Sequence, residues 1–260
     1  MLSAQKIRDK LNSGRPSIGT WMQLASPDAA EILAACGYDW VAVDMEHGGF
    51  SRINLTDIFR ALEVRGAAPF VRVAENSMMN IRAALDAGAR GIILPMIESA
   101  QQLADAMRHI YYPLPEGAAS PRRGGRGVGF CRANLFGKEF ASYLNGSSRE
   151  TLVVAQIEHI CAVGALNEIL EVPGLDAIMV GPYDLSASMG IPGDFANPEF
   201  EKVMSEISKT ARKYKIPMGA HVVEPDPAQL RARIEQGCLF LAYGIDTVFM
   251  QRMAALPSVF

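Results

Sequence analysis

The amino-acid sequence predicts a single (β/α)8 barrel of the α/β class, on three observations. The length of 260 residues suits such a barrel, which needs about 250 residues. Short, almost wholly apolar runs alternate with stretches of helical periodicity, as expected for parallel strands that are covered on both faces. The alternation repeats eight times, which allows the sheet to close. The predicted strands are residues 18–23, 39–44, 68–73, 91–96, 151–158, 176–181, 217–223 and 239–244.

The segments between these strands have the residue types expected at helix ends. Ser26, Ser99 and Asp226 each precede a helical stretch and are suited to cap it. Glycines follow four of the stretches, where a left-handed backbone is needed: Gly37, Gly66, Gly88 and Gly237. The predicted helices are residues 1–14, 27–36, 54–66, 79–88, 100–110, 162–172, 200–214, 227–237 and 246–256.

One segment, residues 111–150, interrupts the alternation with a Gly/Pro/Arg-rich stretch and then a helical one at 133–145. A long loop in a compact domain usually serves as a lid, a binding loop or an interface. We expect its basic cluster, Arg122-Arg123 with Arg126, to be solvated. Because no internal repeat or second domain is visible, the barrel is predicted to span residues 1–260.

The composition excludes several classes of partner. With 25 basic and 28 acidic residues the net charge is −3, so no basic field can hold nucleic acid. No run approaches the ~18–20 apolar residues of a membrane span, and the N-terminus lacks the apolar core of a signal peptide. The four cysteines are widely separated, as in cytoplasmic proteins with reduced thiols. We therefore expect a cytoplasmic protein without nucleic-acid or membrane partners.

Polar residues gather where the predicted strands end, which is the face that carries the active site of such barrels. In VAVDMEHGGF (41–50), an apolar strand ends on Asp44, Glu46 and His47. Arg72 interrupts the third strand, and burying a guanidinium without a partner costs several kcal/mol. Its partner is either an acid on a neighbouring strand or a bound carboxylate or enolate.

Glu158 and Asp184 are 26 residues apart, one βα unit, which places them at the ends of adjacent strands. Two carboxylates this close repel unless a cation or a proton lies between them. Oxygen ligands with vacant coordination positions fit Mg²⁺ or Mn²⁺ better than Zn²⁺. The alternative is a pair of carboxylates that accept hydrogen bonds from backbone amides.

Two further features narrow the chemistry. No lysine lies in a predicted strand core or at its C-terminal end, which disfavours a Schiff-base aldolase and favours a metal as the electrophile. The Gly181-Pro182 turn opens a helix whose backbone N–H groups suit a small carboxylate. Whether His221, in the seventh strand, lines the site remains open.

The sequence resembles the HpcH/HpaI family of metal-dependent pyruvate aldolases over essentially its whole length. The resemblance rests on GYDWVAVDMEH (37–47), PFVRV (69–73), LDAGARGIILPM (85–96), QIE (156–158), VGPYDLSASMG (180–190) and YGIDT (243–247). It implies a phosphoenolpyruvate/pyruvate-type barrel. It also implies a class II aldolase that makes or cleaves a 4-hydroxy-2-oxo acid, through a metal-bound pyruvate enolate and an aldehyde acceptor.

The resemblance implies a role for each matching residue. Glu158 and Asp184 would hold the divalent metal, which is Mg²⁺, Mn²⁺ or Co²⁺. Arg72 would stabilise the enolate oxygen, and His47, paired with Asp86 and supported by Asp44 through water, would transfer the proton at the aldehyde oxygen. The substrate contacts would be Trp21, Gln156, Gly181, Pro182 and Tyr183.

The family resemblance also implies a homo-oligomer, a hexamer or trimer of dimers, that exchanges its last helix between barrels. Two departures concern the acceptor: the segment after Pro113 is longer than the family loop, and the seventh strand reads AHVVEP (220–225) in place of an apolar wall. The alternative function is therefore a citrate-synthase-like or acyl-CoA-using condensing enzyme on the same scaffold, as in siderophore biosynthesis.

Overall fold

A computed structural model describes residues 4–113, 124–146 and 150–256. Within these ranges, eight parallel strands pair in sequence order and close into a barrel, so the predicted fold is confirmed. Each predicted strand matches an observed one to within two residues at either end. The strands are β1 (Ser17–Met22), β2 (Trp40–Asp44), β3 (Ala68–Arg72), β4 (Gly91–Leu94), β5 (Leu152–Ile157), β6 (Ala177–Val180), β7 (Met218–Val222) and β8 (Phe240–Ile245).

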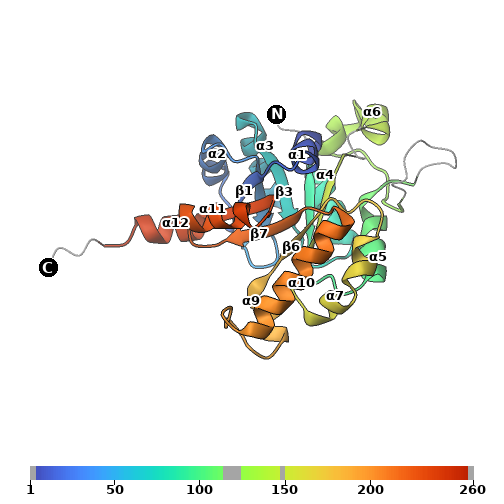
Figure 1. Ribbon diagram of the computed structural model, residues 1–260. Coiled ribbons are helices and arrows are strands. Elements are labelled where there is room, and N and C mark those ends of the chain that lie inside the picture. The colour runs from blue at the N-terminus through green and yellow to red at the C-terminus, as the bar shows by residue number, and fades with distance from the viewer. Residues whose placement is uncertain (1–3, 114–123, 147–149, 257–260) are drawn as a thin grey trace.

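Helices surround this barrel, and most follow a strand directly (Figure 1). The N-caps predicted at Ser26, Ser99 and Asp226 each accept a backbone N–H bond, as expected. The helices are α1 (Ala4–Asn12), α2 (Pro27–Ala35), α3 (Arg52–Arg65), α4 (Met78–Ala87), α5 (Ala100–Ile110), α6 (Phe140–Asn145), α7 (Ile160–Gly164), α8 (Leu166–Leu170), α9 (Pro182–Ser188), α10 (Pro198–Tyr214), α11 (Pro227–Glu235) and α12 (Asp246–Met253), with the 3-10 helix η1 (Arg132–Gly137).

Two predicted helices are each divided in the structure. The stretch 162–172 falls into α7 and α8, because Ala165 between them leaves helical geometry. The stretch 133–145 falls into η1 and α6, and Leu135 and Phe136 have positive φ angles of 49° and 54°. Helical periodicity alone does not reveal such breaks, since the apolar spacing continues across them.

Three aromatic rings fill the barrel interior. Trp40 stacks on Phe240 with ring centroids 4.4 Å apart and planes 4° from parallel, and Phe70 packs against both rings. Glycines make room for them: a Cβ at Gly19 would lie 2.0 Å from the Trp40 ring, and one at Gly91 would lie 2.0 Å from Phe70. The interior is therefore a packed core that leaves the strand ends for chemistry.

Helix α1 covers the N-terminal end of the barrel. Its buried residues Ile7 and Leu11 belong to the same apolar cluster as the interior aromatic rings. Arg8 holds the helix in place through an ion pair with Asp176 at 2.7 Å, next to the start of β6. The carboxyl ends of the strands lie at the opposite end of the barrel.

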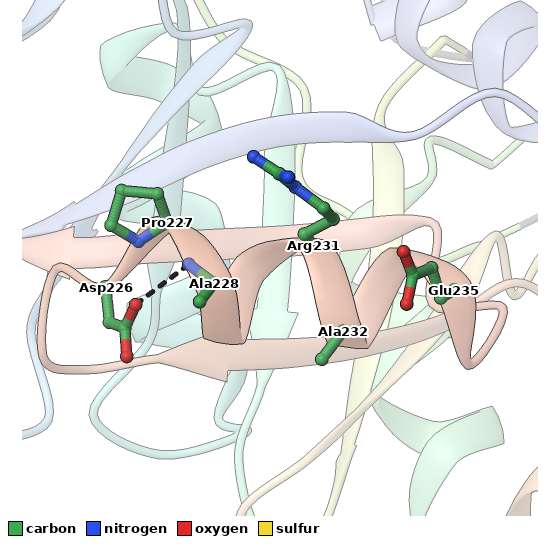
Figure 2. A pocket seen from close by; sticks show the side chains of 6 residues that line it. All are labelled: Asp226, Pro227, Ala228, Arg231, Ala232 and Glu235. Carbon is green, nitrogen blue, oxygen red and sulfur yellow. Dashed lines mark hydrogen bonds between the residues drawn. The ribbon is translucent and has the colours of Figure 1, made fainter.

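The helical layer is incomplete near the C-terminus. Helix α12 projects away from the barrel (Figure 1), and Met250 and Met253 on it are 59% and 87% exposed. Helix α11 contributes no buried residue. A pocket of about 440 Å³ is lined by residues of α11 and its N-cap Asp226, whose side chains are drawn in Figure 2, and contains none of the predicted site residues. None of the helices in the described ranges is long and apolar enough to span a membrane.

The close contact at Gly19 gives a test of the interior packing. We expect Gly19→Ala to destabilise the protein by about 1–3 kcal/mol, because the new methyl group must displace a buried, stacked Trp40. Urea unfolding measures the change. Gly164→Ala is the matched control, since a Cβ there meets nothing within 4 Å, and it should be neutral or slightly stabilising. Equal stabilities for the two variants would contradict the packing account.

Candidate active site

Asp44 and Arg72 form a bidentate ion pair at the carboxyl ends of β2 and β3. They are register partners on adjacent strands, with Arg72 Nε 2.9 Å from Asp44 Oδ1 and Nη2 2.8 Å from Oδ2. Nη1 of Arg72 lies 3.1 Å from a Glu46 carboxylate oxygen. The partner of Arg72 is thus an acid on the neighbouring strand, and N–H groups on Nη1 and Nη2 are left for another acceptor.

Asp44 is held from several sides. It is 1% exposed and also accepts a bond from Gln23 Nε2 at 3.0 Å and from the backbone N–H groups of Glu46 and His47. Burial alone raises the pKa of Asp44, but the bonds and charge of Arg72 hold it below its ordinary value. Asp44 thus fixes the turn that carries His47, and its support of this histidine through water stays a prediction.

Gln23 and Asp246 extend this network to β1 and β8. The Asp246 carboxylate accepts the backbone N–H groups of Gln23 and Leu24 at 2.8 and 2.9 Å, and Thr247 donates to the Gln23 side chain at 3.1 Å. Neither residue was among the predicted site residues. These hydrogen bonds hold the carboxyl ends of the first and last strands, β1 and β8, beside each other.

Trp21 supports the Arg72 guanidinium from its face. The Arg72 Cζ lies 4.5 Å from the ring centroid, a cation–π arrangement. The Trp21 side chain is 3% exposed, and its indole N–H has no hydrogen-bond partner in the described part of the chain. A buried donor without a partner costs free energy, so Trp21 is suited to meet a ligand acceptor.

His221 packs on Trp21, with ring centroids 5.7 Å apart, and its Nε2 lies 3.2 Å from the carbonyl oxygen of Gly244. Burial lowers the pKa of His221 to about 4, so the ring is neutral near pH 7. The seventh strand therefore contributes a neutral ring behind Trp21.

Glu158, directly after β5, is a second buried carboxylate of the site, at 2% exposed. One oxygen accepts the backbone N–H of Met96 at 2.7 Å, and the other accepts Gln156 Nε2 at 3.0 Å. A Cβ at Gly181 would lie 2.4 Å from that second oxygen, so only glycine leaves room for the carboxylate. Burial, reinforced by the charges of Glu46 and Asp184, raises the pKa of Glu158 to about 7.

Asp184 lies in the first turn of α9, follows Gly181 and Pro182, and is exposed. Its negative charge contributes to the raised pKa of Glu158, and the joint role of the two carboxylates stays a prediction. The structure agrees with both interpretations of the pair, a metal site and carboxylates that are hydrogen-bonded to backbone amides. Glu158 accepts a hydrogen bond from a backbone N–H group, and its negative charge also lacks a full counter-charge. The oxygen Oε1 of Gln156 is buried and has no partner among the described residues.

Met96 is a site residue that sequence reasoning missed. Its φ of 49° is rare for a residue with a side chain, and it turns the Met96 N–H toward Glu158. No residue-type signal marks such a position, because methionine has no preference for positive φ.

The predicted pairing of His47 with Asp86 is not present within one chain. His47 is exposed, and its Nε2 lies 3.8 Å from the Glu46 carboxylate. Asp86, on α4, instead accepts a bond from Arg126 Nη2 at 2.6 Å. Within the described ranges no hydrogen bond or ion pair joins His47 to Asp86, so their joint role stays a prediction.

The expectation that Arg126 is solvated is wrong. Its side chain is fully buried and lies against the rings of Tyr112 and Tyr143, with its Cζ 4.6 and 5.9 Å from their centroids. The Asp86 carboxylate neutralises its charge. Its neighbours Arg122 and Arg123 lie outside the described residues.

A family model described as "HpcH/HpaI aldolase/citrate lyase" matches residues 17–252. The chain belongs to this family. A hydroxypyruvate/pyruvate aldolase of Agrobacterium fabrum (strain C58) is 34% identical, over 97% of this chain and 92% of the relative. The crystal structure of a family member from Burkholderia cenocepacia J2315 is 33% identical, with a TM-score of 0.88 over 95% of both chains.

The structure of a citrate synthase, SbnG, is also similar, at 27% identity and a TM-score of 0.80 over 98% of this chain and 95% of that one. The family expected from the sequence motifs is thus confirmed, and with it the class of the enzyme. The chain is an aldolase-type carbon–carbon lyase.

The depressed pKa of His221 predicts a pH effect on stability. In the unfolded chain, His221 takes up a proton below its pKa of about 6.5, whereas in the folded chain it is protonated only below about pH 4. The contribution of His221 to stability is therefore present above pH 6.5 and is lost as the pH falls toward 4. We expect the stability advantage of the wild type over His221→Gln to shrink between pH 7 and pH 4.5 in urea unfolding. An advantage that stays constant would contradict a neutral, buried ring.

Proposed function

We propose that this enzyme is a divalent-metal-dependent aldolase that makes or cleaves a 4-hydroxy-2-oxo acid from pyruvate and an aldehyde. The observation that carries the proposal is the buried carboxylate of Glu158, which has no ion-pair partner among the described residues and whose pKa is raised by burial and by the charges of Glu46 and Asp184. The similarity to a hydroxypyruvate/pyruvate aldolase supports the choice of pyruvate.

The balance of charge argues for a metal. Arg72 forms ion pairs with Asp44 and Glu46, so its single positive charge is already shared between two carboxylates. Glu158 and Asp184 add two further negative charges. An ionised, buried carboxylate needs a cation or a proton nearby. A divalent ion would satisfy Glu158 and Asp184 together, and this account favours the metal interpretation over one of hydrogen-bonded carboxylates.

The donor set fits a hard ion. Carboxylate oxygens with water are the ligands that Mg²⁺ and Mn²⁺ prefer, and Co²⁺ also accepts them. The glycine at 181 leaves space beside the Glu158 oxygen. When bound, the cation supplies Lewis-acid polarisation of the 2-oxo acid, which makes loss of a C3 proton or cleavage of the C3–C4 bond easier.

The residues around Glu158 have complementary tasks. The remaining N–H groups of Arg72 would donate to the oxygen that gains charge as the enolate forms. The Trp21 N–H and Gln156 Oε1, both buried and unpaired within the described ranges, would contact the substrate. The backbone from Gly181 through Tyr183 would hold the pyruvate carboxylate.

His47 would move the proton at the aldehyde oxygen. It lies on the exposed rim of the mouth, where a second substrate can reach it, and Asp44 fixes the backbone of its turn. Asp86 would support this transfer only if another copy of the chain brings it near, because Arg126 occupies it within one chain.

A citrate-synthase-like or acyl-CoA-using condensation is the second candidate function, favoured by the likeness to a citrate synthase. The same enolate would then attack a different carbonyl. Assays of oxaloacetate and an acyl-CoA against a panel of aldehydes separate the two functions. Turnover confined to aldehydes supports the aldolase.

We also propose that the chain forms a homo-oligomer, a hexamer or trimer of dimers, in which α12 packs on a second barrel. The exposed methionines of this helix and the uncovered α11 support the exchange. A cavity of about 720 Å³ between α10, β7 and α11, with Phe200 and Met204 in its wall, offers apolar surface nearby. The free cysteines fit the reducing cytoplasm that we propose as its location.

Proton exchange tests the metal-dependent enolate. We expect the enzyme to exchange the C3 protons of pyruvate with D₂O, measured by NMR, and to lose this activity with EDTA or in Glu158→Gln. Removing the negative charge of Glu158 should abolish metal binding. Glu206→Gln, an exposed glutamate on α10, should exchange like the wild type. Exchange that persists in Glu158→Gln after complete metal removal would refute the mechanism.

Arg72→Ala tests the role of the guanidinium. We expect kcat to fall by about 10²–10³-fold with a smaller change in KM, because the lost interaction grows as charge develops on the oxygen. Arg72→Lys should lie between this variant and the wild type, since lysine keeps the charge without the bidentate geometry. If KM alone rises, Arg72 is a binding residue. Circular dichroism controls for unfolding.

Paired substitutions on α12 test the exchanged helix. We expect Met250→Glu with Met253→Glu to shift the protein to smaller species in light scattering coupled to gel filtration. Two carboxylates cannot be buried against an apolar surface without cost. Gln251→Glu adds charge on the same helix at an exposed polar position and should leave the assembly intact. A wild-type mass for the double variant would contradict the proposal.

A further inference from the structure

Three potential metal ligands of different kinds meet beyond the ends of β4 and β5, outside the site described above. One donor atom each from Glu98, His159 and Cys161 lies within 4.8 Å of the other two. The closest recorded approach, His159 Nδ1 to Glu98 Oε2, is 3.8 Å. Glu98 and His159 are partly exposed and Cys161 is exposed, so an ion can reach all three from solvent.

Local structure holds these side chains in place. His159 caps α7, and its Nδ1 accepts the backbone N–H of Cys161 at 3.2 Å, which brings the ring beside the cysteine. Because a backbone N–H can only donate, this nitrogen presents a lone pair, as a metal ligand must. Glu98 is fixed by a bond from its backbone N–H to the Gln102 side chain at 2.8 Å, just before α5 begins.

The donor set differs in kind from that at Glu158 and Asp184. Thiolate, imidazole and carboxylate together are typical zinc ligands, whereas two carboxylates with water suit magnesium. Donor atoms on a tetrahedral zinc ion lie roughly 3–4 Å apart, given metal–ligand bonds of about 2.0–2.3 Å. Small side-chain rotations would bring the three donors to that spacing.

We propose that Glu98, His159 and Cys161 form a second cation site that takes Zn²⁺ or another thiophilic divalent ion, with a water in the fourth position. Binding replaces the Cys161 N–H bond to Nδ1 if that nitrogen coordinates. The Cys161 thiol loses its proton to solvent as the thiolate binds, so no oxidant or other reactant is needed.

The position of the cluster implies that ion binding would affect the stability of the fold. It joins the segment after β4 to the turn after β5, and these same segments supply the Met96 N–H and the Glu158 carboxylate, which bond at 2.7 Å. An ion at the cluster would cross-link the two segments outside the catalytic mouth. Occupancy should therefore raise Tm, because the ion binds the folded chain only.

Metal binding to the purified full-length chain tests the proposal. The background is Glu158→Gln, which removes the predicted magnesium ligand and makes failure of the two sites distinguishable. We expect this protein, once freed of metal, to bind one Zn²⁺ per chain in competition with a chromophoric chelator. With Co²⁺ it should show the near-ultraviolet charge-transfer band of a thiolate–cobalt bond.

Single substitutions then assign the ligands. Adding Cys161→Ser should abolish the cobalt band and weaken Zn²⁺ binding at least tenfold, and His159→Asn should weaken it similarly. Cys36→Ser is the matched control, since Cys36 is also an exposed cysteine but lies at the end of α2. Cys161 and His159 lie at the surface, so these variants should fold. Unchanged Zn²⁺ binding in Cys161→Ser, or no binding in the Glu158→Gln background, would overturn the proposal.

Discussion

The site depends on the bidentate ion pair between Asp44 and Arg72. Barrel closure places β2 and β3 side by side with these residues in register, so the acid and the guanidinium meet at the mouth. The pair does more than cancel two charges. Asp44 fixes the turn that carries His47, and Arg72 packs on Trp21 with His221 behind it. Loss of either partner would leave an uncompensated charge in a poorly solvated place, which is costly.

This ion pair also uses the positive charge of Arg72, which leaves too little positive charge for the remaining carboxylates of the site. Arg72 is committed to Asp44 and Glu46, so Glu158 is left with a backbone amide, an amide side chain and two neighbouring acids. Burial, reinforced by the charges of Glu46 and Asp184, raises its pKa. A divalent ion would remove this deficit and would provide an electrophile, since the sequence places no lysine at a predicted strand end. On the proposed function, the ion pair would position the groups that contact the substrate and would leave Glu158 available for the metal.

Periodicity was sufficient for the fold and for placing polar strand-end residues on one rim, whereas the roles assigned to these residues rest on the family resemblance. Apolar runs fix the strands to within two residues, and the position of a polar residue at a strand end places Asp44, Arg72 and Glu158 on one rim. What the sequence did not reveal depends on tertiary contacts. The burial of Arg126 between two tyrosines requires partners from distant segments. The strained Met96 backbone has no residue-type signal, and the bond of Asp86 to Arg126, where the sequence predicted a pairing with His47, depends on a contact between distant segments.

The central claim is that Glu158 and Asp184 together hold a divalent cation. Calorimetric titration of Mg²⁺ into the metal-free protein tests it most directly, because magnesium avoids thiolate ligands and so reports on the carboxylate pair alone. The account predicts one Mg²⁺ per chain in the wild type, its loss in both Glu158→Gln and Asp184→Asn, and pyruvate binding that requires the ion. Wild-type magnesium affinity in both variants would contradict it.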